Sequence, residues 1–71
     1  LDEVLVQRVW AKRMGKTING YTKEIRLVRG KVYIQLTSAP LKQEMDMNRD
    51  KIKEMFNRAF QDQVVDEVII K

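Results

Sequence analysis

The sequence between Lys23 and Leu36 constrains the fold most strongly, because apolar and polar residues alternate on both sides of Arg29-Gly30. A short loop containing Gly between alternating, β-branched runs predicts a β-hairpin. With Arg29-Gly30 as the loop, the expected pairs are Val28 with Lys31, Leu27 with Val32, Arg26 with Tyr33, Ile25 with Ile34 and Glu24 with Gln35.

This register gives the hairpin one apolar and one polar face. The apolar face comprises Ile25, Leu27, Val32, Ile34 and Leu36, and the polar face comprises Glu24, Arg26, Tyr33 and Gln35. A slip of one residue would mix the two sets, so the pattern specifies the pairing. An isolated hairpin is only marginally stable in water. The rest of the chain must therefore cover the apolar face.

A first helix is predicted over Leu1 to Met14, where apolar residues recur at helical spacing and Gly15 provides a stop. Trp10 lies on the apolar stripe, which favours a core position over a platform for stacking bases. The residues from Lys16 to Thr22 are expected to form a connector with Asn19-Gly20 as its turn.

A second helical segment follows the hairpin. Ser38 is placed to cap its N-terminus, and Pro40 falls in the first turn, where a missing N–H group is tolerated. The helical period continues to Phe60 but loosens near Met47. The segment is therefore either one long helix or two helices, the second of them capped by Asn48.

The β-branched residues from Val64 to Lys71 predict a third strand that covers part of one hairpin edge. The resulting order is helix, strand, strand, helix (whole or broken), strand. This order predicts an α+β fold, with a three-stranded sheet and the helices on one of its faces. The 71 residues are expected to form a single domain, residues 1–71.

Composition excludes several kinds of site. The chain has no cysteine and no histidine, so disulfides, thiolate metal sites and the usual structural zinc sites are excluded. The nearby carboxylates of Glu44 and Asp46 would point to different sides of a helix, and those of Asp66 and Glu67 to opposite faces of a strand. We therefore expect no catalytic residue, no metal and no cofactor, and a chain that is not an enzyme.

No apolar run approaches the length of a membrane span, and no basic and apolar leader precedes the first helix. We expect a cytoplasmic protein without a membrane partner. Because the chain begins with Leu1 and not with methionine, an N-terminal arm that precedes it could carry function.

Positive charge is concentrated between Arg8 and Gln35. This stretch holds eight Lys and Arg residues and one acidic residue, a net charge of +7, whereas the whole chain carries +4. Such a concentration is typical of a surface that binds a polyanion. The predicted phosphate contacts are Lys12, Arg13, Lys16, Lys23, Arg26, Arg29 and Lys31, with Tyr33 available to stack on a base.

The order of several short motifs resembles the DciA family of bacterial helicase operators. These motifs are Val9-Trp10-Ala11-Lys12-Arg13-Met14-Gly15, the hairpin ending in Leu36-Thr37-Ser38, Glu44-Met45, and Asn57 before the terminal strand. The resemblance, which runs from about Val6 to Ile70, implies a KH-like domain that binds single-stranded or forked DNA. It also implies a nucleoid-associated protein that helps to load the replicative DnaB-type helicase without hydrolysing ATP itself.

The sequence departs from the KH pattern at one loop. The Gly-x-x-Gly loop with which KH domains clamp a nucleic-acid backbone would fall near Asp46-Met47-Asn48-Arg49, which has no glycine. The basic hairpin and first helix are therefore better candidates for the contact.

Alternatively, the chain is a protein-interaction adaptor that contacts no nucleic acid, and its charge serves solubility and encounter with the helicase.

Overall fold

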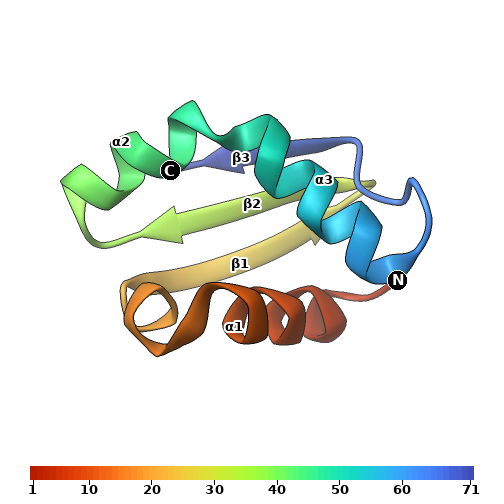
Figure 1. Ribbon diagram of the computed structural model, residues 1–71, viewed down its shortest axis with the longest axis horizontal. Helices are drawn as coiled ribbons and strands as arrows, with labels where there is room; N and C mark the ends of the chain where they lie inside the picture. Colours follow the sequence, from red (N-terminus) through yellow and green to blue (C-terminus); the bar gives the residue numbers. More distant parts are fainter.

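The computed structural model describes residues 1–71 as three helices and a three-stranded sheet (Figure 1). In chain order the elements are α1 (Glu3–Gly20), β1 (Thr22–Val28), β2 (Lys31–Leu36), α2 (Ala39–Met47), α3 (Arg49–Phe60) and β3 (Glu67–Ile70). Strand β2 is central, antiparallel to β1 and parallel to β3. A parallel pair requires a long crossover, which α2 and α3 provide. The α+β class and the predicted order are confirmed, with the second helical segment broken in two.

The hairpin has the predicted register throughout, from Val28 opposite Lys31 to Glu24 opposite Gln35. The loop residues Arg29 and Gly30 both have positive φ, 49° and 81°. Positive φ at both central residues is the geometry of a type I′ turn, whose twist matches that of the strands. One feature was not predicted: the register shifts between Thr22 and Glu24, so the hairpin begins with an irregularity at Lys23.

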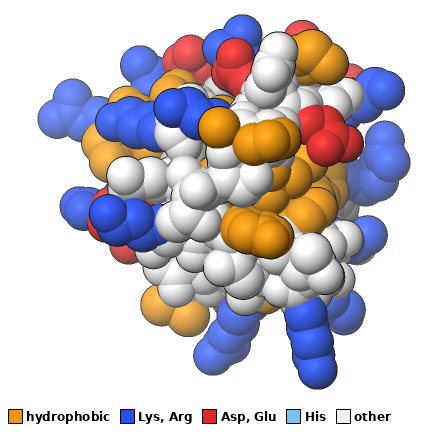
Figure 2. Space-filling view, turned by 90° about the vertical axis from the view of Figure 1, so that its left-hand side faces the viewer, with side chains coloured by type: hydrophobic (Ala, Val, Ile, Leu, Met, Phe, Trp, Pro, Cys, Tyr) orange, Lys and Arg blue, Asp and Glu red, His pale blue; other side chains and the backbone are white.

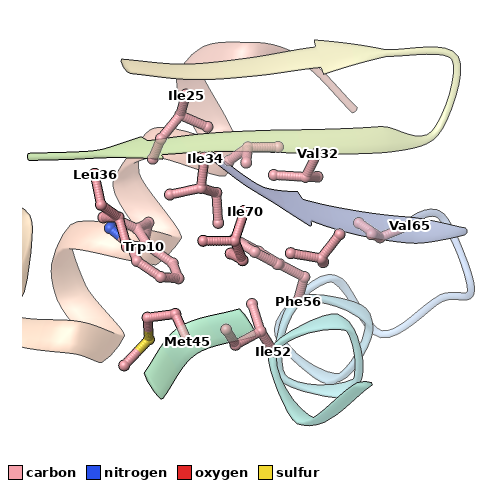
Figure 3. Close-up of a cluster of buried hydrophobic side chains, with 12 residues drawn as sticks. Trp10, Ile25, Val32, Ile34, Leu36, Met45, Ile52, Phe56, Val65 and Ile70 are labelled. Atoms are coloured by element: carbon pink, nitrogen blue, oxygen red, sulfur yellow. The ribbon is translucent and has the colours of Figure 1, made fainter. Parts of the chain in front are cut away.

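The core lies between the sheet and the helices (Figure 3). The apolar residues of the hairpin point into it, together with Val68 and Ile70 of β3. Its centre is Trp10, whose side chain is fully buried and stacks on the ring of Phe56 with centroids 6.2 Å apart. The indole N–H donates a hydrogen bond of 2.8 Å to Oγ1 of Thr22. The core prediction for Trp10 is confirmed.

Helix α1 corrects the prediction that residues 16–22 form a connector. Gly15 interrupts the helical geometry with φ 87° and ψ 175°, but a further helical turn follows and ends at Gly20. That turn is held by Ile18, whose carbonyl accepts hydrogen bonds from the Tyr21 N–H and the Thr22 hydroxyl. Ile18 also packs against the core. The regular helix therefore stops at Gly15, as predicted, and a separate helical turn follows the kink, held by the hydrogen bonds to the Ile18 carbonyl and by the packing of Ile18 on the core.

The break between α2 and α3 lies at Asn48, as one of the two predicted alternatives requires. Ser38 caps α2 as predicted, because its Oγ accepts a hydrogen bond from the Leu41 N–H. The predicted capping of α3 by the Asn48 side chain is wrong. The Asn48 amide donates instead to the carbonyl of Glu44, 2.8 Å away, and so satisfies the end of the preceding helix.

Strand β3 begins at Glu67, three residues later than predicted. The segment that precedes β3 hydrogen bonds to Asn57, a buried polar residue of α3. Its amide group accepts a hydrogen bond from the Val65 N–H at 2.8 Å and donates one to the Val65 carbonyl at 3.0 Å. Asn57 therefore takes the place of a neighbouring strand for Val65 and directs the chain into β3.

Candidate nucleic-acid interface

The polar face of the sheet is uncovered, because the core and the helices lie on the other face (Figure 3). Side chains of the hairpin and of the C-terminal residue line a shallow depression there, among them Arg26, Tyr33 and Lys71. The Lys71 ammonium lies 5.1 Å from the centroid of the Tyr33 ring, in a cation–π contact. A base that stacks on this face of Tyr33 must first displace Lys71.

Arg26 projects from the same sheet but has two acidic partners. Its guanidinium lies 3.6 Å from a carboxylate oxygen of Glu3 and 3.6 Å from one of Glu24. Glu3 is itself fixed, because it accepts a hydrogen bond of 2.9 Å from the Leu27 N–H at the outer edge of β1. Exposed pairs of this kind contribute only about 0–1 kcal/mol. The two carboxylates nevertheless reduce the positive potential around Arg26.

The hairpin tip is also balanced in charge. Lys31 lies 3.9 Å from the Glu67 carboxylate. The N–H of Asp66 donates a hydrogen bond of 2.8 Å to the Gly30 carbonyl, which brings a second acidic residue beside the tip. Arg29 and Lys31 therefore share this end of the molecule with two carboxylates.

The basic residues of α1 and of the start of β1 differ from Arg26 and Lys31, because no carboxylate lies within 4.0 Å of their charged groups. These exposed residues are Lys12, Arg13, Lys16 and Lys23. In Figure 2, Lys and Arg side chains project from the lower edge of the molecule, where Figure 1 shows α1. They form the part of the predicted site with the least compensated charge.

The structure thus divides the eight predicted residues among three places and does not gather them on one continuous basic face. Two lie on the open sheet face, two at the hairpin tip, and four around α1. Figure 2 likewise shows Lys and Arg side chains around the whole rim of that view. A charge count along the sequence cannot reveal this division, because neighbouring residues on strands and helices point to different sides.

Three further basic residues border the site and were not predicted. Arg8 lines the groove between α1 and β1, and Lys51 and Arg58 of α3 line a groove that they share with Arg13. Residues 36–71, which include α3, have a net charge of −1, and this acidic sum concealed Lys51 and Arg58. Lys51 and Arg58 are seven residues apart, a spacing that places both on one side of a helix. This spacing could have identified them as a basic pair from the sequence.

The junction between α2 and α3 does not offer the grip of a KH loop. Asn48 hydrogen bonds back to α2, and Arg49 both donates to the Asp46 carbonyl at 3.1 Å and pairs with its carboxylate at 3.4 Å. The one cation at the junction is therefore partly neutralised, and the sequence there has no glycine.

Comparison with known families gives one match that covers almost the whole chain. The family model described as "Dna[CI] antecedent, DciA" matches residues 1–70, which is essentially the whole chain. The chain belongs to the DciA family. No curated protein and no solved structure gives a match.

Membership of the DciA family places the chain in a group related to helicase loading in bacterial DNA replication, and implies interaction with the replicative helicase DnaB. No helix combines the length and the apolar composition needed to cross a bilayer.

The motifs that carry the resemblance to the DciA family have structural roles in this chain. Trp10 is the centre of the core, Gly15 allows the bend of α1, Ser38 caps α2 and Asn57 holds the segment before β3. These residues therefore identify the fold.

Proposed function

We propose that this chain binds single-stranded or forked DNA through the cations around α1 and helps to recruit or load the replicative helicase without hydrolysing ATP. The observation that carries the proposal is the uncompensated charge of Lys12, Arg13, Lys16 and Lys23. Unpaired surface cations release counterions from a phosphate backbone on binding, which favours tight association at low salt. The chain has no Gly-rich loop followed by Lys and Ser or Thr that could hold the phosphates of ATP.

The hairpin is a secondary part of this proposed interface. Arg26 and Lys31 are paired with carboxylates, and Tyr33 has Lys71 over its ring. They contribute to DNA binding less than the α1 cations do, because each contact requires an existing partner to be displaced or screened.

Fluorescence anisotropy with labelled single-stranded and forked DNA at low and moderate salt tests the proposal. We expect binding that tolerates changes in sequence and weakens steeply with salt, because the contacts are to phosphates. An absence of binding to either DNA at low salt would refute the DNA-binding function.

The alternative is an adaptor that binds the helicase and contacts no DNA. It is favoured by an exposed apolar surface at the start of α1, where Leu1, Val4 and Leu5 are 52%, 53% and 41% exposed. Apolar side chains grouped in this way on a charged surface are typical of a protein-binding site. Pull-down of a purified replicative helicase with and without DNA distinguishes the two functions. The adaptor also requires that no DNA binds to this chain by itself.

A further inference from the structure

The groove between α1 and α3 combines three cations from two helices. It is lined by Arg13 of α1 and by Lys51, Glu54, Met55 and Arg58 of α3. Neither Arg13, Lys51 nor Arg58 has a carboxylate within 4.0 Å. With one carboxylate against three cations, the lining carries a net charge of +2. A concave basic surface attracts anions more strongly than the same charges on a convex surface.

The neighbouring groove between α1 and β1 provides a comparison. It also contains three cations, among them Arg26, but it has two carboxylates, those of Glu3 and Glu24. Arg26 already pairs with both of them. The α1–α3 groove is therefore the site where an incoming phosphate meets the least competition.

The walls of the α1–α3 groove are fixed by the core beneath them. Trp10 of α1 stacks on Phe56 of α3, with an interplanar angle of 20°. Both rings are fully buried, and Figure 3 shows them pointing toward one another. Arg13 follows Trp10 by one helical turn, and Arg58 follows Phe56 by two residues. The cations thus project from helices whose relative position is set before any ligand binds, which lowers the entropy lost on binding.

The lining also suits an unpaired strand. Lys51 and Arg58 are two turns apart, about 10 Å along the helix axis, which leaves room for more than one phosphate group. Met55, half-buried between them, offers an apolar surface to a base. Bases in a duplex are stacked on one another and cannot make such a contact, whereas bases in a single strand can.

We infer that the α1–α3 groove holds the phosphodiester backbone of single-stranded DNA, with Arg13, Lys51 and Arg58 as the residues that contact phosphate. This inference rests on the proposed DNA-binding function and assigns that function to a particular groove. It adds two α3 residues to the interface and makes Met55 its apolar contact.

The test compares two double variants of equal charge. Lys51→Gln with Arg58→Gln removes two cations from the groove, and Lys42→Gln with Lys53→Gln removes two from helix positions outside it. Dissociation constants are measured by anisotropy with a labelled oligothymidine of roughly 15 nucleotides across a salt series. Circular dichroism and thermal unfolding of both variants establish that the fold is retained.

Loss of two phosphate contacts lowers the slope of log K against log salt by about 1.4 and weakens binding about 25-fold at about 0.1 M salt. We expect this change for the groove variant and a smaller change in both quantities for the control variant. Equal weakening of the two variants would overturn the groove assignment, since it would reflect net charge alone. Failure of the unmodified chain to bind at low salt would overturn the DNA-binding function itself.

Discussion

Replacement of Trp10 by alanine tests the central claim about the fold. The indole is fully buried, and truncating a buried Trp costs about 3–5 kcal/mol through lost transfer energy and the cavity left behind. The stacked pair with Phe56 accounts for about 0.5–1.5 kcal/mol of that cost. At 0.05–0.15 kcal/mol per residue, a chain of 71 residues has a stability of about 4–11 kcal/mol. Trp10→Ala should therefore remove about half of the stability or more.

Urea unfolding followed by circular dichroism measures this loss without relying on the fluorescence of the residue that is removed. Trp10→Phe is the matched control, because it keeps an aromatic ring beside Phe56 and loses only the hydrogen bond to Thr22 and some volume. We expect a loss of about 1–2 kcal/mol for it. A loss below about 1 kcal/mol for Trp10→Ala, the size seen at ordinary surface positions, would refute the proposed role of the indole.

Three further substitutions examine other parts of the structure. Asn57→Ala should destabilise by about 1–3 kcal/mol for each group of Val65 left without a partner, and urea unfolding against Asn57→Asp, which keeps only the acceptor, checks this. Gly15→Ala should cost about 1–3 kcal/mol, because φ 87° with ψ 175° is a conformation almost restricted to glycine; an unchanged melting temperature would contradict it. Lys16→Glu should weaken DNA binding more than Arg29→Glu does, because two carboxylates already lie beside the hairpin tip; anisotropy at low salt compares them, and the reverse order would count against the α1 interface.

The features that were predicted correctly depend on residues close together in sequence. The hairpin register follows from strict alternation around Arg29-Gly30, and the start of α2 follows from Ser38. The burial of Trp10 follows from its place on an apolar stripe with helical spacing. In each case a local rule and the global fold favour the same structure, so the sequence pattern is sufficient.

The features that were missed depend on which of several possible hydrogen-bond partners a polar side chain takes. In the last turn of α1, the Thr22 hydroxyl donates a hydrogen bond to the Ile18 carbonyl. Strand β3 begins later than predicted because the N–H and the carbonyl of Val65 hydrogen bond to the Asn57 side chain. Asn48, a good capping residue in principle, uses its amide for the preceding helix. In each case a polar side chain had more than one possible partner, and tertiary packing selected among them.

The arrangement of the candidate site could not be predicted from the sequence either. The list of cations could be read from the sequence, but their grouping could not, because Arg13 and Lys51 come together only when α1 packs on α3. The pairing of Arg26 with Glu3 and that of Lys31 with Glu67 were equally invisible, since the two residues of each pair are distant along the chain.

The elements, their order, the hairpin register and the amount of positive charge can all be read from the order of residues along the chain. These depend on backbone preferences and on periodicity, which act over a few residues. Which cations are paired and which remain free follows from the packing of the elements, because electrostatic compensation depends on distances in space, often between residues far apart along the chain.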